Sequence, residues 1–303
     1  MNNQTILCIK IDIDTDRGTR IGVPNLLSLF DDFGVKATFL FSLGPDNTGR
    51  AIKRIFRPGF FAKVSRTSVV SVYGIRTLLN GVLLPGPHVG RRNEAVMRRV
   101  RDTGHEVGIH CYDHIRWQDG LANMSENDVR EEFGKARKEF ERIFGKPART
   151  AGAAGWQANA LSLGVYDEAG LLYASDARGT HPFFPQCGGR PFKTLQVPTT
   201  LPTLDELLGR PEYPEEHIVD HYLSLLKPNI PNVLTIHAEL EGMKYLSLFR
   251  RFLEQAKTRG VRSMLLRDIV LDLLQDPSSL PKCDLADGIV DGRSGTLAVQ
   301  RCS

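Results

Sequence analysis

The sequence predicts an α/β fold in which helices cover a parallel sheet, and two observations support this prediction. Segments typical of strands and of helices alternate along most of the 303 residues, as they do in parallel α/β proteins. The acidic and histidine residues that could carry chemistry fall at the carboxyl ends of the predicted strands, where the active sites of (β/α) barrels assemble.

Each predicted element has its own signal, because short apolar runs favour strands and apolar residues three and four apart favour helices. The predicted strands are residues 6–13, 37–43, 106–110, 171–175, 195–197, 233–237 and 262–265. The predicted helices are residues 24–33, 93–103, 125–143, 215–226, 244–258 and 266–274. Gly34 and Gly104 end the first two helices, and Ser125 with Asp128 resembles a capping box.

Composition limits the class of protein. An apolar content of 41% allows a substantial core, which we expect to be a single catalytic domain over residues 1–275, with 276–303 as a flexible tail. The five cysteines include no C-x-x-C pair, so we expect neither a disulfide framework nor a zinc ribbon, and a reducing compartment. We also expect no secretory signal and no membrane-spanning segment. The cysteines are Cys8, Cys111, Cys187, Cys283 and Cys302.

Residues 47–93 contain no acidic residue and many basic ones, interleaved with large apolar residues. This mixture predicts an insertion that faces an anionic membrane or an acidic lipid. A solvated basic face over ordinary core helices remains an alternative, and a nucleic-acid surface fits the aliphatic bulk less well. The basic residues are Arg50, Lys53, Arg54, Arg57, Lys63, Arg66, Arg76, Arg91 and Arg92.

Two carboxylates and two histidines suggest a metal site. Asp12 and Asp14 share one face of the first strand, and two buried like charges need a cation, a proton or hydrogen bonds. His110 and His114 are four residues apart, a spacing that lets both rings reach one ion. Two histidines hydrogen-bonded in a loop are the alternative. Two imidazoles and one carboxylate leave positions open for water, as in a catalytic site.

Three segments resemble the successive motifs of the polysaccharide deacetylase (NodB-homology, carbohydrate esterase family 4) superfamily: Ile-Asp-Ile-Asp, Gly-His-Glu-Val-Gly-Ile-His-Cys-Tyr-Asp-His and Leu-Thr-Ile-His. The resemblance implies a distorted (β/α) barrel of about seven parallel strands. It also implies metal-dependent hydrolysis of an N-acyl group. Further segments, among them Asp16-Arg-Gly-Thr-Arg and Ile236-His-Ala-Glu-Leu-Glu-Gly242, resemble the branch of deformylases that act on formamido-arabinose carried on undecaprenyl phosphate.

The resemblance assigns a role to each matching position. Asp12 matches the general base, His237 the histidine that protonates the leaving amine, and Asp176 the acid that orients this histidine. Arg149 stands where an arginine usually pairs with the base. The family's Arg-Pro-Pro-Tyr is here Arg149-Thr-Ala-Gly, and its Asp-Asp is Asp12-Ile-Asp14. The matching metal ligands are Asp14, His110 and His114.

Other polar residues are candidates for substrate contacts. Arg17 and Arg20 follow the carboxylates and, with Arg50, could bind the lipid phosphate, although ordinary loop solvation is equally compatible. Glu239 and Glu241 could hydrogen-bond the sugar amine. His105 precedes its strand and is expected to be structural.

Together these observations predict an amide hydrolase with one divalent ion, which could be zinc, cobalt or manganese. The implied reaction removes formyl from 4-deoxy-4-formamido-L-arabinose on undecaprenyl phosphate at the cytoplasmic side of the bacterial inner membrane. The implied physiology is lipid A modification and polymyxin resistance. The alternatives are an N-deacetylase of another lipid-linked or polymeric amino sugar, and a non-catalytic protein that binds lipid or metal. The sequence indicates neither nucleic acid nor a protein partner.

Overall fold

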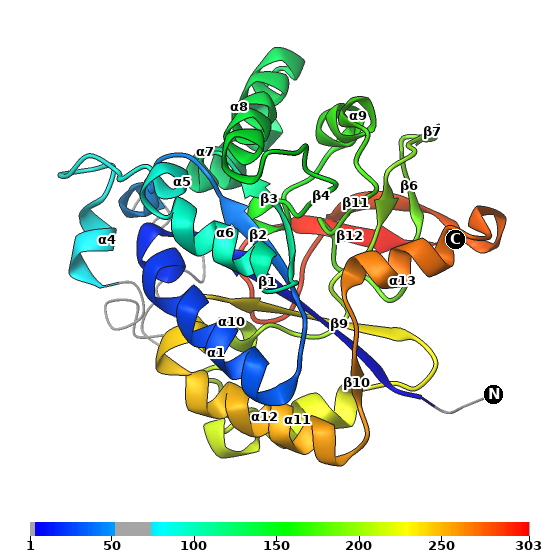
Figure 1. Cartoon of the computed structure of the whole chain (residues 1–303). Coiled ribbons are helices and arrows are strands. Elements are labelled where there is room, and N and C mark those ends of the chain that lie inside the picture. Colours follow the sequence, from blue (N-terminus) through cyan, green and yellow to red (C-terminus); the bar gives the residue numbers. More distant parts are fainter. Residues whose placement is uncertain (1–3, 52–73, 303) are drawn as a thin grey trace.

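An eight-stranded parallel sheet forms the centre of the molecule (Figure 1). The computed structural model describes residues 4–51 and 74–302. The strand order is β10-β1-β2-β3-β4-β5-β8, and β9 also pairs with β1. The strands are β1 (Ile6–Ile13), β2 (Thr38–Ser42), β3 (Glu106–Cys111), β4 (Thr150–Ala151), β5 (Tyr173–Ala174), β8 (Leu195–Gln196), β9 (Pro231–His237) and β10 (Arg262–Ser263).

The pairing around β1 shows how the sheet curls into a barrel. β9 runs along one edge of β1, whereas β10 pairs with Ile6 and Leu7 and β2 pairs with residues 10–13 on the other edge. The sheet therefore has seven strand positions around its circumference. Beyond β8, the backbone N–H groups of Thr200 and Leu201 donate to Val233 O on β9. This arrangement confirms the predicted distorted (β/α) barrel.

Helices cover the outside of the sheet, and α1, α11 and α12 lie side by side along one side of it (Figure 1). As expected, Gly34 ends α1 with φ 65°, and Ser125 and Asp128 form a capping box at α8. The helices are α1 (Val23–Phe33), α4 (Ile75–Leu79), α5 (Val89–Arg92), α6 (Glu94–Asp102), α7 (His114–Gly120), α8 (Glu126–Phe144), α9 (Ala160–Ala169), α10 (Leu204–Leu207), α11 (Ile218–Leu225), α12 (Leu246–Thr258) and α13 (Leu266–Leu273). Shorter helical turns are η1 (Gly18–Gly22), η3 (Leu121–Asn123), η4 (Ala154–Trp156), η5 (Glu215–His217), η6 (Leu240–Lys244) and η7 (Pro277–Ser279).

Both faces of β1 are buried, as parallel sheets covered by helices require. Ile9, Ile11 and Ile13 belong to the main hydrophobic core. Lys10 and Asp12 alternate with them and are also buried, at 0% and 2% exposure. Because residues i and i+2 share a face, β1 carries a polar row into the barrel interior.

The predicted flexible tail is wrong for most of its length. A second sheet, with the order β12-β11-β6-β7, contains two strands from this segment, and Cys283 is bonded to Cys302 in a disulfide. Cys283 and Leu285 are buried, whereas Lys282 and Asp284 are exposed, and a search for helical periodicity overlooks this period of two. The disulfide also departs from the expectation drawn from cysteine spacing. The strands are β6 (Phe184–Cys187), β7 (Arg190–Pro191), β11 (Lys282–Gly288) and β12 (Leu297–Arg301).

The predicted insertion leaves and rejoins the barrel at one place. Asp46 N donates to Pro87 O, and Val89 N donates to Gly44 O, each at 2.8 Å. Five of its basic residues lie outside the described residues, namely Lys53, Arg54, Arg57, Lys63 and Arg66. In the described part, Ile75 is 68% exposed and Leu83 is 75% exposed. The boundaries of 1–275 and 47–93, and the lipid-facing role, remain predictions.

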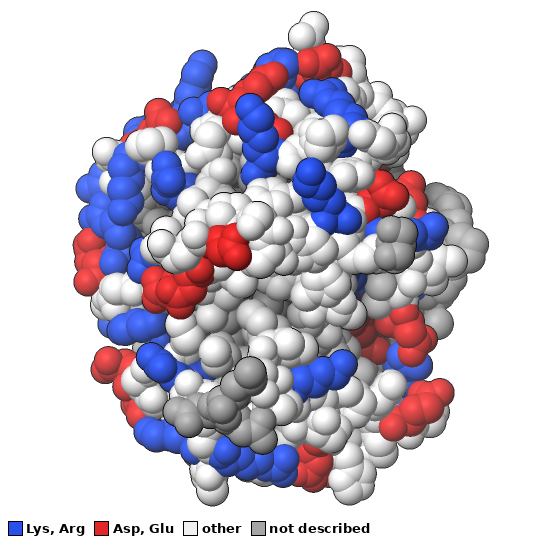
Figure 2. Space-filling model, turned by 90° about the vertical axis from the view of Figure 1, so that its right-hand side faces the viewer, with Lys and Arg blue, Asp and Glu red and all other residues white. Residues whose placement is uncertain are grey.

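The surface away from this insertion carries mixed charge. Figure 2 shows the side of the molecule that bears β6, β7 and α13, where residues of both signs surround a largely uncharged centre. The described residues on this face therefore form no continuous basic surface. No described helix is both long and apolar enough to cross a membrane.

Candidate active site

Asp14, His110 and His114 meet at the carboxyl end of the barrel, as the sequence predicts. Asp14 follows β1, His110 lies near the end of β3, and His114 is the first residue of α7. Asp14 Oδ1 lies 3.3 Å from His110 Nε2 and 3.4 Å from His114 Nε2. One ligand atom from each residue lies within 4.8 Å of the others. The three side chains can therefore converge on one ion.

Neighbouring groups fix the orientation of these side chains. His110 Nδ1 lies 2.7 Å from Gly152 O, which leaves Nε2 directed toward Asp14. Asp113 caps α7 by accepting from the backbone N–H groups of residues 115 and 116, and this sets the start of the helix at His114. A carbonyl or carboxylate on the second ring nitrogen is usual for histidines that bind metals.

The electrostatics of the group also fit a cation. Burial favours a neutral Asp14, but His114 and His110 hold the pKa of this carboxyl below its ordinary value. Asp14 Oδ1 is nevertheless buried without a hydrogen-bond partner among the described residues. A carboxylate oxygen with spare acceptor capacity beside two imidazole nitrogens fits a divalent ion such as zinc, cobalt or manganese.

Asp12 is paired with Lys10, whereas the sequence resemblance assigned this pairing to Arg149. Lys10 Nζ lies 3.6 Å from Asp12 Oδ2 and donates to Ser175 O at 3.0 Å. Arg149 is exposed and precedes β4, at the opposite end of that strand from the site. The assignment to Arg149 is therefore wrong. Lys10 could have been found from the sequence, since it lies two residues before Asp12 and shares its face.

His237 ends β9 and is the direct neighbour of Asp12 in the strand pairing. Its Nδ1 is buried and lacks a hydrogen-bond partner among the described residues, and its ring lies 6.3 Å from that of Trp156. Asp176, which was expected to orient His237, instead accepts from Ala153 N and Gln196 Nε2, both at 2.7 Å. Burial raises the pKa of Asp176 to about 6.

Glu239 and Glu241 support the backbone of the site. Glu239 Oε1 accepts from Thr15 N, Thr15 Oγ1 and Asp14 N, and Glu241 Oε2 accepts from His237 N. Burial raises the pKa of both glutamates to about 8. At 1% and 2% exposure, these side chains hold the loops after β1 and β9 in place. A direct contact of Glu239 with substrate remains a prediction.

The three candidate phosphate-binding arginines differ in their surroundings. Arg17 Nη1 lies 3.7 Å from Met243 Sδ, and Arg50 Nε donates to Gly81 O at 3.0 Å. Arg20 and Arg50 are exposed. The binding of a phosphate by these side chains remains a prediction.

One wall near His237 was not predicted. The Arg293 and Arg178 guanidinium groups lie 4.3 and 5.6 Å from the centre of the Trp156 ring. Both arginines are ion-paired with Glu206. Arg293 lies between β11 and β12, in the segment predicted to be a tail. The pairing of these two strands in the second sheet brings Arg293 to Trp156.

A polar cavity of about 240 Å³ lies between α7 and the loop before β12. Gln118, one helical turn after His114, lines it together with Gly155, Gln157 and Arg293.

Comparison with known proteins identifies relatives. Residues 10–174 match the family described as polysaccharide deacetylase. The chain is 36% identical to the "Probable 4-deoxy-4-formamido-L-arabinose-phosphoundecaprenol deformylase ArnD" of Shewanella sediminis, over 98% of this chain and 95% of the relative. It is 31% identical to the protein of the same name from Wigglesworthia glossinidia brevipalpis, over 94% and 98% of the two chains.

A solved structure supports the fold. The "putative polysaccharide deacetylase" of Mycobacterium smegmatis superposes with a TM-score of 0.63 at 16% identity, covering 95% of this chain and 96% of that one. The same barrel is therefore found in a protein whose sequence has diverged widely from this chain.

Proposed function

Because the chain belongs to the polysaccharide deacetylase family and is a hydrolase that acts on an amide bond, we propose that it removes formyl from 4-deoxy-4-formamido-L-arabinose on undecaprenyl phosphate. The observation that carries the proposal is the convergence of Asp14, His110 and His114 beside Asp12 and His237. The names of the two curated relatives support the formamido sugar as substrate.

Asp14, His110 and His114 are the residues that would hold one divalent ion. Such an ion, when bound, polarises the amide carbonyl and lowers the pKa of water toward ~7. The three residues themselves orient the ligand atoms, with Gly152 O fixing the ring of His110. Three protein ligands would leave coordination positions for water and for the formamide.

Asp12 is the proposed general base. Its Oδ1 has no hydrogen-bond partner among the described residues and lies 3.8 Å from His110 Nδ1, so it remains able to accept a proton. Lys10 stabilises the ionised carboxylate from the other side. Only the ionised form of a carboxylate can take the proton of the attacking water.

His237 is the proposed general acid. It is the neighbour of Asp12 in the β1–β9 pairing, so both groups can reach the same scissile bond. Water adds its oxygen to the formyl carbon, the carbon–nitrogen bond breaks, and His237 gives a proton to the leaving nitrogen. The products are formate and the amino sugar. Trp156 shields one side of the imidazole.

The lipid carrier suits the insertion between β2 and α5. Ile75, Val82 and Leu83 are 68%, 52% and 75% exposed, and the surrounding segment is rich in Lys and Arg. Apolar side chains beside cations are what a surface needs to lie against anionic lipid. The proposed place of action is thus the cytoplasmic side of the inner membrane, by peripheral binding. The product would be the aminoarabinose donor for lipid A, with polymyxin resistance as its consequence.

Formate release from the lipid-linked formamido sugar tests the proposal. The metal-loaded enzyme should release formate, chelation should stop the reaction, and added metal should restore it. Asp12→Asn should lower kcat about 10²–10⁴-fold, the size of a general-base contribution, while the bound metal is retained. Release of acetate from an N-acetyl substrate instead of formate would assign another N-deacetylase. Unchanged activity of Asp12→Asn would show that Asp12 is not the general base, and absence of any release of formate or acetate would favour a non-catalytic protein.

Membrane binding has a separate test. The pair Ile75→Asp and Leu83→Asp should reduce co-sedimentation with phosphatidylglycerol vesicles at least about tenfold, because burying each side chain contributes ~1.5–3 kcal/mol. Ile289→Asp is the matched control, since Ile289 is 81% exposed but lies between β11 and β12. If the control lost as much vesicle binding as the pair, the insertion would not be the membrane-binding surface.

A further inference from the structure

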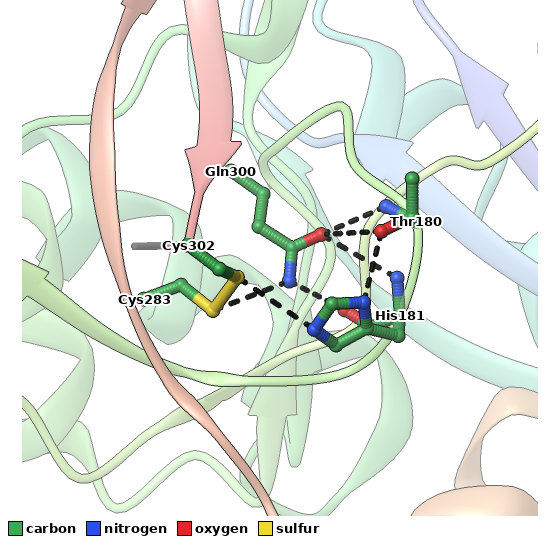
Figure 3. Close-up of a disulfide and its surroundings, with 5 residues drawn as sticks. All are labelled: Thr180, His181, Cys283, Gln300 and Cys302. Atoms are coloured by element: carbon green, nitrogen blue, oxygen red, sulfur yellow. Dashed lines mark hydrogen bonds between the residues drawn. A yellow bond between two sulfur atoms is a disulfide. The ribbon is translucent and has the colours of Figure 1, made fainter.

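A second group of possible metal ligands lies outside the active site. Within residues 4–51 and 74–302, two groups bring three ligand atoms within 4.8 Å of one another. One is the group built on Asp14, and the other consists of His181, Cys283 and Cys302 (Figure 3). We call this second group the C-terminal clasp.

The clasp joins three separate parts of the chain. Cys283 is buried on β11, Cys302 is exposed directly after β12, and His181 lies in the loop between β5 and β6. The two cysteines form a disulfide, and Cys302 Sγ lies 3.6 Å from His181 Nε2. The imidazole is therefore already turned toward the sulfur atoms (Figure 3).

Hydrogen bonds hold His181 and its loop in place. Gln300 Oε1 accepts from Thr180 N and His181 N, and it also accepts from the Thr180 hydroxyl at 3.4 Å. Thr180 Oγ1 lies 2.8 Å from His181 Nδ1, and this hydrogen bond fixes the orientation of the imidazole. His181 Nε2 is thereby directed at Cys302. This is the arrangement of a histidine that binds metal and is held by a second hydrogen bond.

The sulfur side of the clasp is supported in the same way. Gln300 Nε2 lies 3.6 Å from Cys283 Sγ and donates to His181 O at 3.0 Å. A single side chain thus ties the histidine loop to the buried cysteine. An N–H group directed at sulfur stabilises a thiolate, the form in which cysteine binds metal.

We propose that the clasp has two alternative states: a disulfide, and a zinc-type site in which reduced Cys283 and Cys302 bind one divalent ion together with His181. A dithiol reductant supplies two electrons and two protons. The sulfur–sulfur bond breaks, two thiols form, and the reductant becomes a disulfide. Metal binding then releases the two thiol protons. Two thiolates and one imidazole suit Zn²⁺ or Co²⁺, with a fourth position for water.

The clasp has a structural task in either state. The segment between Cys283 and Cys302 includes Arg293, which lies 4.3 Å from the ring of Trp156 in the wall near His237. Where the compartment is reducing, a disulfide does not persist. A metal that joins the same residues would keep this segment closed under those conditions. The inference depends only on the clasp geometry and holds whatever substrate the active site takes.

Cobalt binding tests the inference, because thiolate ligands give Co²⁺ an intense near-ultraviolet charge-transfer band. Asp14, His110 and His114 offer no sulfur, so metal at the active site adds nothing to this band. When reduced protein is titrated with Co²⁺ under anaerobic conditions, the band should appear. The same titration of the oxidised protein should give no band. Separate reduced and oxidised samples loaded with Zn²⁺ should differ by one zinc equivalent per chain, with the higher content in the reduced form.

Variants separate the clasp from other sites. Cys302→Ser should abolish the band, and His181→Ala should weaken Co²⁺ binding there at least tenfold. Cys187→Ser is the matched control, since Cys187 is a free cysteine on the neighbouring strand β6 and should leave the band unchanged. His110→Ala should also leave it unchanged.

Three results would overturn the inference: no band in the reduced wild-type protein, a band that survives Cys302→Ser, or equal zinc content in both redox states. The comparison of reduced with oxidised wild-type protein needs no substitution, so it stands even if a variant folds poorly.

Discussion

Buried carboxylates lie at both ends of the barrel, but their oxygens are satisfied differently. At the amino end, Glu106 Oε2 accepts from Thr38 Oγ1 and Tyr173 OH, each at 2.7 Å, and from Arg267 N at 3.3 Å. At the carboxyl end, Asp12 Oδ1 and Asp14 Oδ1 have no hydrogen-bond partner among the described residues.

The difference separates a carboxylate whose oxygen is used in hydrogen bonds from carboxylates whose oxygens keep spare acceptor capacity. Glu106 is 5% exposed and Asp12 is 2% exposed, so burial alone does not distinguish them. A buried oxygen without a partner costs free energy, and folds retain such atoms mainly where a ligand compensates them. The carboxyl end therefore keeps the capacity to bind an ion and a substrate, while the amino end uses its carboxylate to join strands.

The largest difference between variants should come from two histidines, one just before β3 and one near its end. His110→Ala removes a metal ligand, so the protein should lose its bound ion and at least about 10³-fold in kcat/KM. His105, which lies before β3 and accepts from Ala37 N at 3.2 Å, provides the control. His105→Ala should lower the free energy of unfolding but keep the metal. Metal analysis, kinetics and urea unfolding measure these effects, and metal retained by His110→Ala would contradict the assigned ligands.

Replacement of Lys10 should have the next largest effect, which is a loss of folding stability. Lys10→Met leaves Asp12 buried without its cation and should lower the free energy of unfolding by about 3–5 kcal/mol. Urea unfolding should show that Lys10→Arg retains most of the stability. The double variant Lys10→Met with Asp12→Asn should recover part of the loss, because no uncompensated charge remains. Additive losses in the double variant would mean that the two side chains do not interact.

Replacement of Glu106 should have the smallest effect. It should change how the free energy of unfolding depends on pH. Burial raises the pKa of Glu106 above its ordinary 4.5, so the folded chain holds this proton more tightly than the unfolded chain. Stability from this group is therefore lost as pH rises from about 4.5 toward the raised pKa, by about 1.4 kcal/mol for each pKa unit.

Glu106→Gln cannot ionise and should lose less stability than the wild type between pH 4 and pH 8. Urea unfolding across this range measures the difference, and the activity of the variant should remain near that of the wild type. A pH dependence identical to that of the wild type, or the loss of bound metal, would show that Glu106 is not the structural acid described above.

The site shows where sequence reasoning succeeds. Asp14, His110 and His114 were identified because their residue types suit a metal and because carboxyl ends of parallel strands meet at one rim. The alternation of Ile9, Ile11 and Ile13 with polar residues likewise gave the correct face of β1. These inferences use local periodicity, which a sequence displays directly.

Predictions that required a particular distant partner failed more often. Arg149 was assigned to Asp12 by its position in a motif, but the cation that lies there is Lys10. Asp176 was assigned to His237, but it bonds to Ala153 and Gln196. In each case several residues could have filled the role, and only the packing of the strands selects one.

The sequence by itself determined the parallel barrel, the convergence of Asp14, His110 and His114 at one rim, and the buried row of β1, since side-chain direction follows from the local backbone conformation. Only the tertiary structure decided that Lys10 reaches Ser175, 165 residues away, and that residues 282–288 add a strand beside β6. Such partners are set by which surfaces pack together after the chain has folded, and no short stretch of sequence contains that information.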